Sequence, residues 1–147
     1  MRFAALRRYC ELTSRVASSV APEEQHSDYE AGLADINGEM WRIRTARVTP
    51  TKPGAFVALW HRGDSGETAP FTDDGRVAGV LVFVDDGMNF GVFRFEPSHL
   101  VQLGIFASAR SKGKRGFRVY PSWCKDLNSQ ASKSQRNQAK AFSLLSP

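Results

Sequence analysis

The sequence predicts an α/β fold in which a mixed sheet of five to six strands is flanked by helices. The segment 78–84 (AGVLVFV) is apolar on both faces, which is typical of a central strand that is covered on both sides. Apolar residues recur at helical spacing near the N-terminus, and short segments of alternating polarity follow, separated by turn residues. Helices packed on a mixed sheet are the simplest way to cover the 78–84 strand.

The first part of the chain is predicted to hold two helices and a hairpin. Residues 2–20 carry apolar side chains at intervals of three and four, as an amphipathic helix does. Pro22, with Glu23 and Glu24 behind it, favours the start of a second helix, because proline fits a first turn and carboxylates stabilise that end of a helix. Asn37-Gly38 then predicts a tight hairpin turn, since both residues adopt positive φ easily.

The middle of the chain is predicted to supply most of the strands. In the strand expected over 40–49, Arg42 and Arg44 share one face, while Arg47 points the other way. Further strands are expected at 54–62, 78–84, 89–95 and 116–121, the last of these being the final strand.

Two more helices complete the predicted order. Segment 96–104 gives a short helix, with Pro97 near its start and Gly104 at its end. Segment 126–145 gives a polar closing helix, held by Leu127, Ala131 and Phe142. A length of 147 residues suits one core, so residues 1–147 are expected to form a single domain with the helix within residues 1–20 at its periphery.

Positive charge is concentrated at the C-terminal end. Residues 110–147 hold nine Lys or Arg residues and one acid, a net of +8, whereas the preceding 109 residues hold 11 basic and 14 acidic residues, a net of −3. Segment 110–118 alone contains five cations, and aromatic residues follow as far as Trp123. Such asymmetry is typical of a polyanion-binding surface, although a solvated basic tail has the same composition.

The sequence contains no membrane or export signal. No apolar run approaches the roughly 20 residues that span a bilayer. Charges at Arg7, Arg8 and Glu11 interrupt the N-terminus, which therefore lacks the unbroken apolar stretch of a secretory signal. Cys10 and Cys124 are far apart and form no metal-type pair, which fits a reduced, cytoplasmic interior, with one disulfide between them left open.

Two long and unusual blocks stand out in the sequence, VTPTKPGAFV (48–57) and GKRGFRVYP (113–121). Further characteristic pieces are DYEA (28–31), the rest of 42–62, PF (70–71), 91–105 and NSQASKSQ (128–135). Together these stretches resemble the MepB family of small bacterial proteins, from about residue 26 to residue 142. The order and spacing of the two long blocks make the match specific.

The resemblance implies a core like that of restriction endonucleases, a mixed sheet with one helix before it and one within it. Family members often have Lys at the positions of Arg47 and His61, and an aromatic residue at the position of Asn137. The first difference keeps a cation, whereas the other two weaken any role that needs His61 or Asn137 itself.

The strands that would carry a nuclease site lack its carboxylates. Nucleases with this core hold a divalent metal between acids on adjacent strands, followed by a Lys. Segments 41–49 and 55–62 contain no acid, and Glu30 is one carboxylate that could point inward. A metal-dependent nuclease or nucleotide-acting enzyme that uses Glu30 is therefore the alternative to binding alone. No metal-ligand spacing or nucleotide loop is present in the sequence, and no cofactor is expected.

We therefore expect a binding protein, with nucleic acid, DNA or RNA, as the partner. Cations would contact phosphates with little sequence preference, and aromatic rings would stack on unpaired bases. A small-ligand or protein-interaction module is the second alternative, and each strand arginine could instead form a structural ion pair, such as Arg44 with Glu30. The expected binding residues are Arg44, Arg47, Lys52, Trp60, Lys112, Lys114, Arg115, Arg118 and Tyr120.

Overall fold

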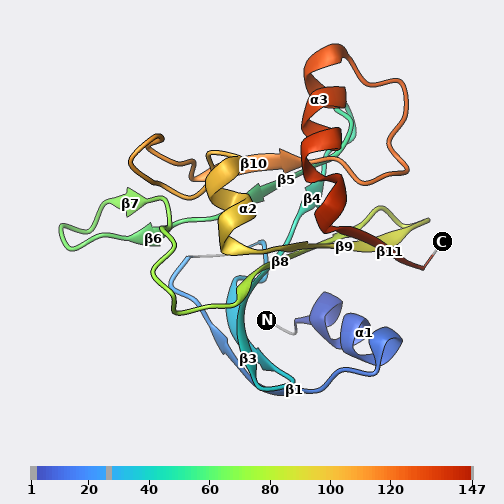
Figure 1. Ribbon diagram of the computed structural model, residues 1–147. Coiled ribbons are helices and arrows are strands. Elements are labelled where there is room, and N and C mark those ends of the chain that lie inside the picture. Colours follow the sequence, from blue (N-terminus) through green and yellow to red (C-terminus); the bar gives the residue numbers. More distant parts are fainter. Residues whose placement is uncertain (1–2, 26–27, 147) are drawn as a thin grey trace.

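The computed structural model describes residues 3–25 and 28–146, and its largest sheet has six strands. Figure 1 shows this sheet with the helices around it. The strand order is β1-β2-β3-β8-β9-β11. β3 and β8 are parallel and all other neighbours are antiparallel, so the predicted mixed sheet is confirmed. The strands are β1 (Ala17–Pro22), β2 (Gly32–Ile36), β3 (Glu39–Thr45), β8 (Gly79–Asp85), β9 (Phe90–Phe95) and β11 (Phe142–Ser146).

A smaller antiparallel sheet has the order β10-β5-β4, formed by Gly116–Val119, Ala55–Ala58 and Arg47–Val48. The chain passes from the large sheet to this one at Ala46, whose N–H donates to the carbonyl of Phe83 at 2.8 Å. The single strand predicted over 40–49 is therefore divided into β3 of the large sheet and β4 of the small sheet. The strand predicted over 54–62 is also divided, because β5 ends at Ala58 and a short hairpin follows, formed by β6 (His61–Arg62) and β7 (Thr68–Ala69).

Helices lie on both sides of the large sheet (Figure 1). On one side, α1 (Ala4–Thr13) buries Leu6 and Tyr9 in a cluster with Trp41, Ile43 and Phe83. On the other side, α2 (Pro97–Gln102) and the small sheet bury an apolar cluster against β8 and β9. α3 (Ser129–Gln138) packs beside β10 on that same side.

Three predicted features are present as expected. Asn37 and Gly38 both have positive φ, 51° and 87°, and join β2 to β3 as a two-residue hairpin. β8 is buried from Gly79 to Val84 in the middle of the sheet. α2 has Pro97 in its first turn, and Gly104, with φ 72°, follows its end.

The predicted helix over 2–20 is wrong in its second half. It includes Arg2, which lies outside the described residues. α1 ends at Thr13, because Ser14 adopts a left-handed conformation (φ 55°) and the N–H of Arg15 donates to the carbonyl of Cys10. Residues 17–22 then pair with β2 as an edge strand. Valines at helical spacing can equally lie in a strand, and here the pairing with β2 decides.

No second helix follows Pro22 in the described residues 23–25 and 28–31. Glu23 and Gln25 instead direct their side chains toward arginines of β3, and the N–H of Glu23 donates to the carbonyl of Ala31 at 2.9 Å. Glu30, expected on this helix, lies in irregular chain with φ 47°. Long-range ion pairing thus overrides a local sequence that favours a helix start.

The closing helix is shorter than predicted. α3 begins after Asn128, whose Oδ1 accepts the N–H of Ala131 at 2.8 Å, and gives way to a 3₁₀ turn, η1 (Ala139–Ala141). The segment from Phe142 then pairs with β9 as β11, so the strand predicted at 116–121 is not the last one. In the described part of the chain, no helix is long and apolar enough to cross a membrane.

Candidate functional site

The small sheet has a buried inner face and an accessible outer face. Val57, Phe117 and Val119 point inward into the apolar cluster. The register aligns Arg47, Phe56 and Arg118 across the three strands, so these three side chains share the outer face. Two of the predicted cations, taken from segments 71 residues apart, therefore lie on one surface.

Arg118 is held across this outer face by the turn that connects β4 to β5. Its Nε donates to the carbonyl of Pro53 at 3.4 Å, and its Nη2 donates to Oγ1 of Thr49. Lys52 lies in the same turn and is exposed. The turn that contains Lys52 therefore lies next to Arg118.

Lys114, Arg118 and Tyr120 line a polar cavity of about 340 Å³ at the free edge of β10. Gln138 of α3 occupies that edge as a strand neighbour would. Its Nε2 donates to the carbonyl of Arg118, and its Oε1 accepts the N–H of Tyr120, both at 2.9 Å. We define the basic face as Arg47, Lys52, Phe56, Lys114, Arg118 and Tyr120.

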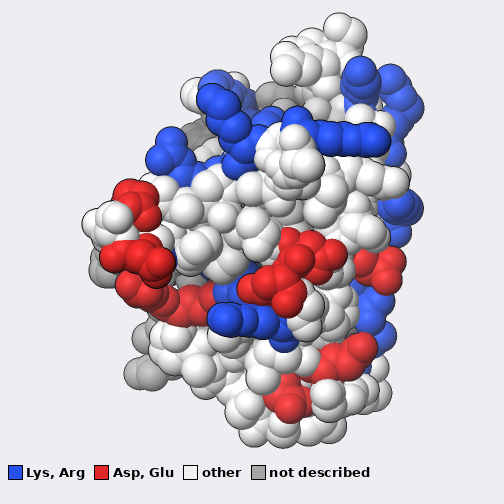
Figure 2. All heavy atoms as spheres, turned by 60° about the vertical axis from the view of Figure 1, so that its left-hand side comes forward, with Lys and Arg blue, Asp and Glu red and all other residues white. Residues whose placement is uncertain are grey.

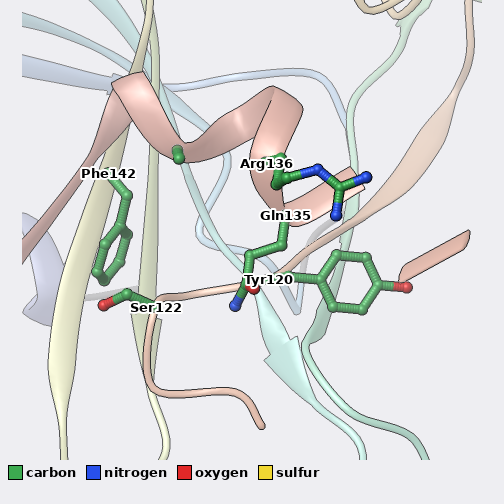
Figure 3. A pocket seen from close by; sticks show the side chains of 6 residues that line it. Tyr120, Ser122, Gln135, Arg136 and Phe142 are labelled. Atoms are coloured by element: carbon green, nitrogen blue, oxygen red, sulfur yellow. The ribbon is translucent and has the colours of Figure 1, made fainter. Parts of the chain in front are cut away.

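Tyr120 also borders a second cavity, of about 210 Å³, between the segment that follows β10 and α3 (Figure 3). Arg136 of α3 extends on the same side as the Tyr120 ring. The ring itself rests against Gly54, where a Cβ atom would come within 2.8 Å of it. Arg136 was not identified from the sequence as a neighbour of Tyr120. The feature that could have indicated it is the position of Arg136 in a polar C-terminal helix within a segment rich in cations.

Most cations of the basic face have no carboxylate partner. Arg47 pairs with Asp28 at 3.2 Å, but both side chains are exposed, 58% and 76%. Among the described residues, no carboxylate lies within 4.0 Å of the charged groups of Lys52, Lys114 or Arg118. Figure 2 shows most Lys and Arg side chains of one face in its upper half, with Asp and Glu side chains below them.

Two further predicted cations lie beside the basic face rather than on it. Arg115 reaches the β6–β7 hairpin, where its Nη1 donates to Oγ1 of Thr68 at 3.1 Å. Lys112 is exposed in the loop that precedes β10. Neither has a carboxylate within 4.0 Å in the part of the chain that the structure describes. They extend the positive surface toward the hairpin.

Arg44 lies in the interior, with 0% of its side chain exposed. Its Nη1 donates to Oε1 of Glu23 at 2.6 Å, and its Nε donates to Oε1 of Gln25 at 3.2 Å. Burial lowers the pKa of Arg44, and the Glu23 carboxylate opposes that shift. Arg44 therefore forms a structural ion pair, as the alternative reading of the sequence expected, but its partner is Glu23 and not Glu30.

Trp60 is separated from the basic face. Its backbone N–H donates to Oε1 of Gln25 at 3.3 Å, and the guanidinium of Arg62 lies 5.3 Å from the centre of its ring. It lines a different cavity, together with Arg42 and Phe71. Both Trp60 and Arg44 were predicted to contact nucleic acid, and neither is part of the surface that the other cations form.

Glu30 uses both carboxylate oxygens in local hydrogen bonds. Oε2 accepts the N–H of Ala4 at 3.0 Å, at the start of α1, and Oε1 accepts the hydroxyl of Thr45 at 2.8 Å. A carboxylate at this position satisfies a free N–H of the helix and opposes the positive end of its dipole. Within residues 3–25 and 28–146, no three His, Cys, Asp or Glu side chains are grouped closely enough to hold a metal ion.

Comparisons with known proteins agree with the resemblance seen in the sequence. A family profile described as MepB-like matches residues 23–143. The fold is similar to the crystal structure of MepB, with a TM-score of 0.84 and 30% sequence identity over 97% of each chain. No match was found among curated proteins. With most of its length matched by the family profile, the chain belongs to the MepB-like family.

Proposed function

We propose that the protein binds nucleic acid, or another extended polyanion, on the basic face, and that it does so without catalysis. One observation supports this above the others: the register places Arg47 and Arg118 on one accessible surface, with Lys52 and Lys114 beside them. Cations without their own carboxylates are free to neutralise phosphates and release counterions. The contacts would go to the backbone and carry little sequence preference.

The pairing of Arg47 with Asp28 is compatible with this proposal. Exposed ion pairs contribute only about 0–1 kcal/mol, so a phosphate can displace Asp28 at little cost. The aromatic side chains Phe56 and Tyr120 lie among the cations and offer ring surface to unpaired bases. Stacking on such a ring is worth on the order of 1–3 kcal/mol per base.

The proposal includes a core related to restriction endonucleases that has lost its catalytic acids. The absence of acids from 41–49 and 55–62 supports it, as does the structural use of both Glu30 oxygens. We also propose a cytoplasmic location, which the two free thiols, Cys10 and Cys124, support.

The salt dependence of binding tests the proposal. Labelled single-stranded and duplex oligonucleotides are titrated at several salt concentrations with wild type and with Lys114→Ala/Arg118→Ala. The slope of log K against log salt should become shallower by about two contacts, each worth about −0.9 on duplex and about −0.7 on a single strand. Arg8→Ala/Arg15→Ala, which removes two cations on the α1 side of the large sheet, is the matched control and should leave the slope unchanged.

Two results would count against the proposal. Equal slopes for wild type and for the Lys114→Ala/Arg118→Ala variant would show that the basic face does not contact the polyanion. Cleavage of labelled DNA or RNA in Mg²⁺ or Mn²⁺, lost in Glu30→Gln, would instead establish the enzyme alternative.

A further inference from the structure

A further cavity lies away from the basic face, between β3, the segment after β1 and the β6–β7 region. It measures about 490 Å³. Arg42, Trp60 and Phe71 contribute to its wall, and Glu23 and Gln25 border it from the irregular segment. We refer to it as the arginine cavity.

The buried charges at this cavity do not balance. Arg42 and Arg44 follow each other on one face of β3, and both guanidinium groups donate to the same carboxylate, that of Glu23. The side chains of Arg42 and Glu23 are only 10% and 11% exposed, and that of Arg44 is 0% exposed. The group therefore keeps one net positive charge in a poorly solvated place, where an unneutralised charge is costly.

Arg42 is held in position and has a donor to spare. Its guanidinium lies 3.8 Å from the centre of the Phe71 ring, and its Nη1 donates to Glu23. Its Nε is buried and has no hydrogen-bond partner among the described residues, and the same holds for Nη2 of Arg44, which does not line the cavity. A guanidinium that is fixed in place and borders a cavity is well suited to an oxyanion.

The rest of the wall is mixed. Trp60, Phe71, Leu33, Met40 and Val77 supply apolar or aromatic surface, and Glu24, His61, Arg62 and Thr72 supply polar groups. Of the acids besides Glu23, Asp74 pairs with Arg76 at 3.6 Å and Glu24 is exposed. The cavity thus places the Arg42 guanidinium beside an apolar and aromatic surface that favours a flat or apolar body.

We propose that the arginine cavity binds a small carboxylic acid with an apolar or aromatic body, its carboxylate on Arg42 and its body against Trp60 and Phe71. One negative charge would neutralise the excess charge of the arginine pair, which favours a carboxylate over a doubly charged phosphate. Nucleic-acid binding plays no part in this site, so the proposal stands or fails separately from the function proposed for the basic face.

Benzoate serves as the probe. Acetate, which has the carboxylate without the ring, and benzyl alcohol, which has the ring without the charge, are the comparison compounds. Calorimetric titration and the melting temperature are measured for each at constant ionic strength. We expect benzoate to raise the melting temperature of the wild type, and acetate and benzyl alcohol to have much smaller effects, because a ligand that binds only the folded state stabilises it by mass action.

Two variants change the buried charge in opposite directions. Glu23→Gln removes the carboxylate that competes with benzoate for the guanidinium groups. It also removes the short-range repulsion between the two carboxylates, so benzoate should bind at least about tenfold more tightly. Arg42→Met leaves Arg44 and Glu23 as a balanced pair and should abolish benzoate binding. Asp28→Asn, which removes a carboxylate from the exposed Arg47 pair, is the matched control and should not change benzoate affinity.

Benzoate binding that persists in Arg42→Met would overturn the proposal, as would equal effects of benzoate, acetate and benzyl alcohol on the wild type. Tighter binding of inorganic phosphate than of benzoate would also overturn it, because the charge argument selects a monoanion. If Glu23→Gln does not fold, the Arg42→Met comparison still decides.

Discussion

The buried guanidinium of Arg44 is compensated by Glu23 and Gln25, which lie in the segment after β1 and accept its hydrogen bonds. Alternation along the strand correctly predicted that Arg42 and Arg44 share a face. It could not predict that this face is buried, since the compensating carboxylate lies about 20 residues earlier, in a segment whose local sequence favours a helix. The exposure of Lys114 was easier to predict, because a lysine without a nearby acid usually remains exposed.

The two thiols give a prediction at the same scale. Burial raises the pKa of Cys10 and of Cys124 above the ordinary value of 9.0, despite backbone hydrogen bonds from Ala17 and Gly54 that oppose the shift. Their contribution to stability is therefore fully present below the unfolded pKa and is lost as pH rises through the folded pKa. In urea titrations under reducing conditions, the free energy of unfolding should fall more steeply from about pH 8 to about pH 10 in wild type than in Cys10→Ala/Cys124→Ala. Parallel curves would contradict this assignment.

At the scale of elements, the internal strands of the large sheet were predictable and its two outer strands were not. β8 is buried on both faces, and its composition shows this directly. β1 and β11 are the outer strands of the large sheet and pair on one side only, so their short sequences carry little pattern of their own. β1 and β11 become strands because they pair with β2 and β9, and the short local sequence of each does not show this pairing.

The free edge of β10 depends on one side chain of α3. Gln138→Leu should leave the N–H of Tyr120 and the carbonyl of Arg118 unpaired and lower the free energy of unfolding by about 2–4 kcal/mol. Gln130→Leu, an exposed position on the same helix, should change it by about 0.5 kcal/mol or less. Urea denaturation measures both variants, and faster amide exchange at Tyr120 in Gln138→Leu alone would locate the effect. Similar losses for the two variants would show that Gln138 does not have this role.

At the scale of the whole molecule, the large sheet separates two apolar clusters. One lies under α1, and the other lies under α2 and the small sheet. From the sequence, the N-terminal helix was expected at the periphery, because the resemblance to the MepB family begins only at about residue 26. Leu6 and Tyr9 are each only 3% exposed, so α1 is packed on the sheet. We propose that both clusters unfold together as a single domain.

Leu6→Ala tests this proposal. The cavity it creates should lower the free energy of unfolding by about 2–5 kcal/mol. Leu12→Ala, on the same helix at 49% exposure, should change it by about 0.5 kcal/mol or less. Transitions followed by tryptophan fluorescence and by far-UV circular dichroism should coincide and shift together. Two separate transitions would mean that α1 and its cluster form an independent unit.

The passage of one continuous segment through both sheets limits how this chain can change in length. Side chains alternate along β3, so inserting or deleting one residue between the Asn37-Gly38 turn and Ala46 would exchange the two faces of the strand. Trp41 and Ile43 would then point toward the arginine cavity, and two guanidinium groups would enter the apolar layer beneath α1. Single-residue insertions or deletions in this stretch are therefore expected to prevent folding. The exposed connections at 63–67 and 72–76 can vary in length without that penalty.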